Sequence, residues 1–223
     1  TVFMPAFSLE RTQEILYMLD ELSDEDYTLP KFPIFLDSPL AIDAMPTYEK
    51  YTDYYNAIAL EKYKKGDDFF DFPQLTITRS VEESKKINTI KGPKMIIAGA
   101  GMMNGGRILH HAHRYLSDPK STLIIVGYQA QNTLGRRLHE GAKKVKVFGD
   151  SIHVKCTIRA ISALSAHGDQ KKLMDWIGSG NEIPKKIYFV HGEPHVATEL
   201  AHRVQNTYHV ETFIPEIGTV IEV

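Results

Sequence analysis

Apolar residues fall into short continuous runs separated by segments with helical spacing. Four such runs cover residues 2–4, 33–36, 94–98 and 122–126. Helical patterns follow them over 9–22, from about 41 onward, over 107–116 and over 133–141. Strands that are apolar throughout and alternate with helices are typical of a parallel sheet covered on both faces. The pattern therefore predicts an α/β fold with a doubly wound, Rossmann-like parallel sheet flanked by helices.

The pattern changes after about residue 145. Residues 145–148 and 152–161 alternate between apolar and polar, as half-exposed antiparallel strands do. Beyond them the spacing predicts a helix over 170–177, a strand over 186–190, a helix over 196–207 and terminal strands over 210–223. We place a domain junction near Gly149, which divides the chain into residues 1–148 and 149–223.

Composition is that of an ordinary globular protein, with 43% hydrophobic and 24% charged residues. No apolar run approaches the ~20 residues of a membrane span, and no signal peptide is visible. Cys156 is the only cysteine, which excludes a disulfide framework and a thiolate zinc cluster and makes a reducing cytoplasm the simplest setting. Because the chain opens at Thr1, without an initiator methionine and inside a predicted strand, we expect it to be a piece of a longer polypeptide.

Charge is distributed unevenly along the chain. Residues 1–90 carry 9 basic and 17 acidic side chains, whereas residues 91–223 carry 17 and 11. Basic residues are concentrated between Arg136 and Arg159, a bias that can attract phosphates, although composition alone favours an ordinary solvated surface. Residues 61–80 are charged and aromatic without clean periodicity, so we expect an irregular segment there.

Glycines are concentrated between the third apolar run and the helix that follows it, over residues 99–106. Backbone amides in such a loop can approach an anion, and the candidates here are Gly101, Met102, Asn104 and Gly105. As a dinucleotide-binding fingerprint the loop fails, because Asn104 stands where the third glycine belongs and no acidic residue is clearly placed to bind a ribose. A tight turn that packs helix on strand explains the same glycines, so both interpretations stay open.

Three histidines, His110, His111 and His113, suggest a metal site that helical geometry does not favour. His111 and His113 point roughly 200° apart on a helix and cannot share an ion. His110 and His113 could share one, but no carboxylate follows at a useful spacing. We therefore expect surface or groove histidines.

Two further histidines stand where a predicted strand or loop gives way to a helix, a place where α/β folds expose reactive side chains. The run from Ser165 through His167 to Asp169 offers a hydroxyl, an imidazole and a carboxylate, although Asp169 is well placed as a helix N-cap and His167 could equally bond to backbone. His191 ends a predicted strand, whose rigid backbone suits a metal ligand. A lone histidine at a strand end is more often structural, so this residue is a candidate ligand only.

Taken in order, these segments resemble the β-CASP branch of the metallo-β-lactamase fold. The matching stretches run nearly end to end: 5–14, 37–41, 101–106, 126–129, 133–135, 165–167 and 190–193. The match is closest to bacterial and archaeal relatives of the pre-mRNA 3′-end endonuclease. By this resemblance, residues 1–148 are most of the inserted β-CASP domain. Residues 149–223 are then the C-terminal part of a metallo-β-lactamase-like αββα domain.

The resemblance implies a metal-dependent phosphodiesterase that hydrolyses RNA, with two zinc ions in each intact active site. It implies that His167 acts on the scissile phosphate or the leaving oxygen, with Ser165 beside it as a second catalytic residue. It also implies that His191 completes the metal site, in a form that favours RNA over DNA. The glycine loop, together with Arg136 and Arg137, then becomes a candidate for contacts with RNA phosphates.

The chain departs from the family in one respect, because the HxHxDH motif that holds most of the metal occurs nowhere in the 223 residues. We expect the missing ligands upstream of Thr1 and expect the isolated chain to be inactive, since a catalytic zinc needs at least three protein ligands. Two other hypotheses stay open: a catalytically silent scaffold or RNA-binding subunit, and a nucleotide-binding module that rests on the glycine loop alone. The expected partner is RNA and not a membrane, and oligomeric state stays open, with a homodimer as one alternative.

Overall fold

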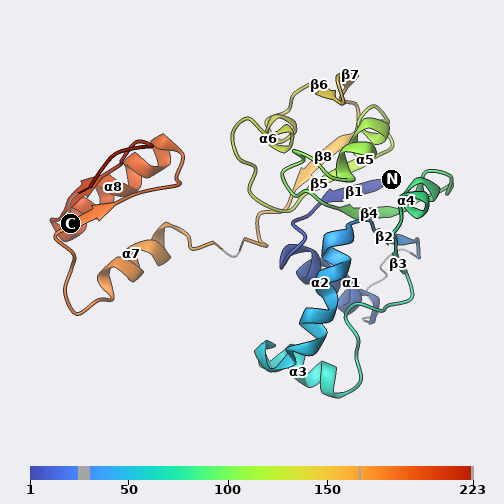
Figure 1. The fold of residues 1–223 in the computed structure, drawn as a ribbon, viewed down its shortest axis with the longest axis horizontal. Helices are drawn as coiled ribbons and strands as arrows, with labels where there is room; N and C mark the ends of the chain where they lie inside the picture. The colour runs from blue at the N-terminus through green and yellow to red at the C-terminus, as the bar shows by residue number, and fades with distance from the viewer. Residues whose placement is uncertain (25–30, 166, 222–223) are drawn as a thin grey trace. The chain divides into compact units, whose positions relative to one another are not determined.

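The structure, a computed structural model, describes residues 1–24, 31–165 and 167–221 (Figure 1). The chain divides into two compact units, residues 1–165 and 166–223. The strand at residues 157–160 belongs to the sheet of the first unit. The division into family domains at residues 148 and 149 stays a prediction.

The first unit is built on a six-stranded sheet in the order β3-β2-β4-β1-β5-β8, and every neighbouring pair is parallel. The strands are β1 (Val2–Pro5), β2 (Ile34–Leu36), β3 (Leu75–Ile77), β4 (Met95–Ala98), β5 (Thr122–Ile125) and β8 (Thr157–Ala160). β2 and β4 are buried at every position, which explains why their sequences are continuously apolar. The predicted parallel sheet is thereby confirmed.

Helices cover both faces of this sheet (Figure 1). They are α1 (Arg11–Asp24), α2 (Pro39–Lys50), α3 (Ala57–Lys64), α4 (Val81–Ile87), α5 (Ile108–Tyr115) and α6 (Leu134–His139), with a short 3-10 turn, η1 (Thr52–Tyr54). Alternate residues of β4 enter two separate cores: Met95 and Ile97 pack with α1 and α2, whereas Ile96 and Ala98 pack with α5. This two-sided burial identifies the doubly wound layer.

An antiparallel hairpin, β6 (Lys144–Val147) and β7 (Asp150–His153), follows α6. The prediction of antiparallel strands over 145–148 and 152–161 is correct for this hairpin and wrong beyond it. β8 pairs in parallel with β5, with Thr122 opposite Thr157 and Ile125 opposite Ala160. Because β8 is an edge strand with mostly exposed side chains, its sequence alternates whichever way it runs.

The second unit contains α7 (Gln170–Gly178), β9 (Lys186–Tyr188), α8 (Pro194–Tyr208) and β10 (Glu211–Phe213). β9 and β10 form a two-stranded parallel sheet, with the rings of Tyr188 and Phe213 stacked at 5.1 Å. The Tyr208 hydroxyl donates to the Met174 carbonyl at 2.6 Å and so joins α8 to α7. Of the strands expected over 210–223, only β10 is found among the described residues.

Residues 61–80 are not wholly irregular, because they hold the end of α3 and the edge strand β3. β3 pairs with β2 in parallel, yet two of its three residues are exposed. No helix among the described residues is long and apolar enough to cross a membrane.

Candidate phosphate-binding and metal-binding residues

The glycine loop lies at the carboxyl edge of the parallel sheet, directly after β4, where α/β folds bind ligands. Its own carbonyls accept hydrogen bonds from three of the N–H groups around it: Met103 donates to Ala100 at 3.0 Å, Ile108 to Gly99 at 3.0 Å and Ala100 to Gly105 at 3.4 Å. The loop is thus closed on itself and keeps a fixed shape.

The backbone amides that were predicted to contact phosphate donate none of the hydrogen bonds that close the loop. Within the part of the chain that the structure describes, the N–H groups of Gly101, Met102, Asn104 and Gly105 donate to no backbone or side-chain acceptor. Their exposure differs: Asn104 is exposed, Met102 and Gly105 are half-buried, and Gly101 is buried. A Cβ on Gly101 would lie 2.9 Å from the Phe7 ring, so Gly101 serves close packing and the other three amides can reach a ligand.

Gly106 closes the loop in a conformation that only glycine adopts without strain. Its φ is +74°, and a Cβ there would lie 2.3 Å from the Gly99 carbonyl oxygen. We expect Gly106→Ala to lower the free energy of unfolding by about 2 kcal/mol or more, because backbone atoms have to move and a left-handed φ is costly for alanine. Urea unfolding of the chain measures this loss.

The neighbouring substitution Gly105→Ala is the matched control for Gly106→Ala. A Cβ on Gly105 meets nothing within 4 Å, and its φ is not in the left-handed region. An equal loss of stability in the two variants would contradict the assigned role of Gly106.

The loop is braced by the segment that leads into α6. Gln129 Nε2 donates to the Gly101 carbonyl at 3.0 Å, and the Gly135 N–H donates to the Met102 carbonyl at 3.2 Å. Arg136 Nη1 donates to the Gln129 carbonyl at 3.3 Å, so the structure brings Arg136 to the predicted loop. Its guanidinium also contacts Glu140, with Nε 2.6 Å from Oε1.

Arg137 belongs to a different surface from Arg136. Its side chain is exposed, and Nη2 donates to the carbonyl of Lys144 on β6 at 3.5 Å. Adjacent residues on α6 therefore point to the loop and to the hairpin, respectively. The two arginines do not form one phosphate clamp.

Asp37 is a polar centre at the same sheet edge that the sequence analysis did not single out for its chemistry. The carboxylate follows β2, is fully buried, and accepts hydrogen bonds from Arg107 at 2.7 Å, Thr78 at 2.8 Å and Ser84 at 2.6 Å. His111 Nε2 lies 2.7 Å from Asp37 Oδ2. Burial on its own raises the pKa of Asp37, but the hydrogen bonds from His111, Ser84, Thr78 and Arg107 outweigh it and hold the pKa at about 2.

The expectation of surface or groove histidines is wrong for His111. Its side chain is 2% exposed, and its Nδ1 is buried without a hydrogen-bond partner among the described residues. His110 and His113 are exposed, and His113 Nε2 lies 2.9 Å from Asp150 Oδ2. The missed signal was Asp37 itself, a carboxylate directly after a buried strand.

His167 and Asp169 lie at the start of α7 in the second unit. The Asp169 side chain accepts a hydrogen bond from the Lys172 N–H at 2.8 Å, as an N-cap does, so this capping role is confirmed. His167 is exposed, and so is Ser165, the last residue of the first unit. The catalytic roles of Ser165 and His167 stay predictions.

His191 lies between β9 and α8, exposed and in a left-handed conformation with φ of +68°. The described residues contain no group of three or more His, Cys, Asp or Glu side chains that could hold a metal ion. A catalytic zinc needs at least three protein ligands, so the residues described here do not form a zinc site on their own. His191 can supply one ligand, and its role as a ligand stays a prediction.

Comparisons with known proteins match both halves of the chain. Residues 12–138, more than half of the chain, match the Beta-Casp domain, and residues 151–215 match the Zn-dependent metallo-hydrolase RNA specificity domain. The second description suggests zinc as the metal of the family.

Among curated relatives, Ribonuclease TTHA0252 of Thermus thermophilus is 34% identical over 86% of this chain and 43% of its own length. An RNase J-like protein of Methanocaldococcus jannaschii is 33% identical over 100% of this chain and 50% of its own length. Transcription termination factor FttA of Methanosarcina mazei is 29% identical over 94% of this chain and 33% of its own length. The chain thus spans at most half the length of these relatives. It belongs to the β-CASP family of metallo-β-lactamase-fold RNA nucleases.

Proposed function

We propose that this chain is part of a zinc-dependent ribonuclease, with two zinc ions per active site whose remaining ligands lie outside the chain. The observation that carries the proposal is the match of residues 12–138 to the Beta-Casp domain and of residues 151–215 to the Zn-dependent metallo-hydrolase RNA specificity domain. Two exposed histidines in the second unit, each just before a helix, support it.

The roles proposed for this chain's own residues follow from phosphodiester chemistry. In hydrolysis the oxygen of a water molecule bonds to phosphorus while the P–O bond to the leaving oxygen breaks. His167 gives a proton to that leaving oxygen, because an imidazole exchanges protons near neutral pH. Ser165 donates a hydrogen bond to a phosphate oxygen. The free amides of Met102, Asn104 and Gly105 bind RNA phosphates, as backbone N–H groups in a glycine loop do. Their fixed positions in the closed loop favour this role, since no reordering is needed on binding.

His191→Ala tests the proposal in the whole protein, meaning this chain with its upstream segment. We expect zinc content per molecule to fall and RNA cleavage to fall with it, because the variant removes a metal ligand. Metal analysis of the purified protein and cleavage of a labelled RNA measure the two effects separately.

His195→Ala is the matched control for His191→Ala. His195 lies four residues away in the first turn of α8, and its side chain is 73% exposed. We expect zinc content and cleavage to be unchanged in this variant. Unchanged zinc and an unchanged rate in His191→Ala would together defeat the ligand assignment, and a whole protein without zinc or activity would instead indicate an RNA-binding subunit.

A further inference from the structure

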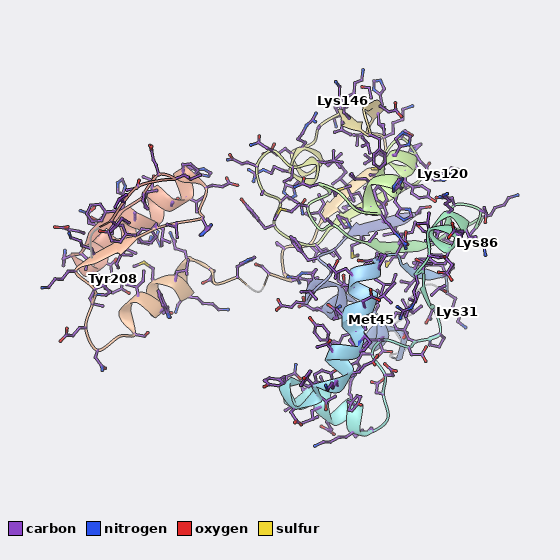
Figure 2. The ribbon with its side chains drawn as sticks, viewed as in Figure 1. Lys31, Met45, Lys86, Lys120, Lys146 and Tyr208 are labelled. Atoms are coloured by element: carbon purple, nitrogen blue, oxygen red, sulfur yellow. The ribbon has the colours of Figure 1, made fainter. Side chains whose placement is uncertain are left out.

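The β6–β7 hairpin of the first unit has one apolar face and one basic face. The register pairs Lys144 with His153 and Lys146 with Ser151, and all four side chains are exposed. The alternate residues lie in the core: Val145, Val147 and Ile152. Because side chains alternate across a strand, the two lysines of β6 project from the same outer face. Figure 2 labels Lys146 at this end of the unit.

The lysines of this hairpin are not neutralised by the protein. Elsewhere, Lys62 lies 2.9 Å from Glu21 and Lys65 lies 2.7 Å from Glu61. Within the described residues, by contrast, the four lysines of residues 143–155 form no ion pair with a carboxylate: Lys143, Lys144, Lys146 and Lys155. The segment has a single carboxylate, Asp150, which contacts His113. The hairpin therefore presents a positive surface that attracts a polyanion.

An aromatic ring stands at the tip of the same hairpin. Phe148 and Gly149 form the two-residue turn, with φ of +53° and +87°. Such turns favour Asn-Gly, and a bulky residue at positive φ is uncommon. Phe148 is nevertheless 56% exposed as a residue, and the centroid of its ring lies 4.7 Å from that of His110 and 6.2 Å from that of His113. The two histidines support the ring from α5 and leave much of it open to a partner.

We propose that the β6–β7 hairpin binds single-stranded RNA, with phosphates along Lys144 and Lys146 on the outer face and, where the RNA passes round the turn, a base stacked on the exposed part of Phe148 at the tip. Alternate residues of a strand are about 7 Å apart, close to the separation of successive phosphates in an extended nucleic acid strand. Lysines beside an exposed ring are the combination that binds single strands without sequence preference. The choice of RNA rests on the proposed function. An acidic protein would use the lysines but has no planar base to place on the ring.

The test measures binding of the 223-residue chain to a labelled single-stranded oligoribonucleotide by fluorescence anisotropy over a series of salt concentrations. Each phosphate contact contributes about 0.7 to the slope of log K against log salt for a single strand. We expect Lys144→Ala with Lys146→Ala to lower this slope by about 1.4, which is a loss of about 25-fold in affinity at 0.1 M salt. Replacing both lysines by arginine keeps the charge and should retain the binding.

Lys85→Ala with Lys86→Ala is the matched control, because it removes the same charge from two exposed lysines on α4. Figure 2 labels Lys86. We expect little loss of affinity in this variant. Phe148→Leu should weaken binding to the single strand by about fivefold or more without changing the salt slope, since it removes only the stacking surface. Binding to a double-stranded RNA, whose bases are already stacked, should not change.

Four outcomes would overturn the proposal: no binding of RNA by the chain, an unchanged salt slope in the hairpin variant, an equal loss in the α4 control, or equally tight binding of a polyglutamate of the same charge. The last outcome would identify an acidic protein as the partner. None of these results bears on zinc content or on cleavage in His191→Ala, so failure of the hairpin surface and failure of the proposed function remain distinguishable.

Discussion

Replacing His167 by alanine in the whole protein should lower the rate of RNA cleavage by about 100-fold to 10,000-fold, the usual contribution of a positioned general acid. The reason is that the leaving oxygen would depart without a proton donor. Zinc content and RNA affinity should stay unchanged, because the proposed role of His167 concerns neither. Single-turnover cleavage of a labelled RNA, with metal analysis of the same preparation, measures these quantities.

A purely structural role for His167 makes a different prediction. The residue stands two positions before Asp169, whose side chain caps α7. If His167 only supported this helix start, His167→Ala would lower the thermal stability of the protein and leave the pH dependence of cleavage intact. If it is the general acid, stability is retained and the alkaline limb of the pH–rate profile disappears. Asp169→Ala supplies the comparison, because it should cost about 1 kcal/mol of stability through loss of the cap.

Asp37→Asn should destabilise the first unit more than any surface substitution, by about 3–5 kcal/mol. The change keeps the shape of the side chain but leaves the partly buried Arg107 and the buried His111 without their carboxylate. Asp43→Asn is the matched control, since Asp43 pairs with Arg79 at 3.1 Å with both side chains exposed. An exposed pair contributes about 0–1 kcal/mol. Urea unfolding of the chain compares the two variants, and similar losses would refute the importance of the buried centre.

The same carboxylate makes a prediction about acid stability. The pKa of Asp37 is about 2 in the folded chain against an ordinary 3.8. A depressed pKa contributes stability that is complete above the unfolded value and is lost as the pH falls toward the folded value. This contribution is about 2 kcal/mol and should disappear between about pH 5 and pH 2. Asp37→Asn should show a correspondingly weaker dependence in that interval.

The central part of the fold could be predicted from sequence because its strands are buried on both faces. β2 and β4 have no polar position, and continuously apolar strands that alternate with helices are typical of a parallel sheet covered on both faces. The edges could not be predicted in the same way. β3 has two exposed residues of three, and β8 has three of four. The direction of a strand is set by the connection that precedes it. The alternation of apolar and polar residues within the strand does not reveal this direction.

The candidate sites show the same contrast between features that a local sequence pattern contains and features that distant residues determine. Spacing on a helix correctly separates His111 from His113, but the burial of His111 depends on Asp37, 74 residues earlier, which no local pattern contains. The glycine loop could be located from sequence, whereas the distinction between Gly101 and its neighbours needed the Phe7 ring that covers it. Arg136 and Arg137 are adjacent in sequence, and only the structure separates their surroundings.

The position of β1 within the sheet has a consequence for how this chain acquires its structure. Val2 pairs with Met95 on one side and with Thr122 on the other, so β1 is an interior strand whose neighbours both follow it much later in the chain. The helix α1 can cover Met4 early, but β1 has no strand to pair with until Met95 and Thr122 have been synthesised. Pairing between strands that are far apart in sequence slows folding and leaves apolar segments exposed until the partner strands are available. During translation the first unit is therefore at its most vulnerable to aggregation until β4 and β5 have emerged.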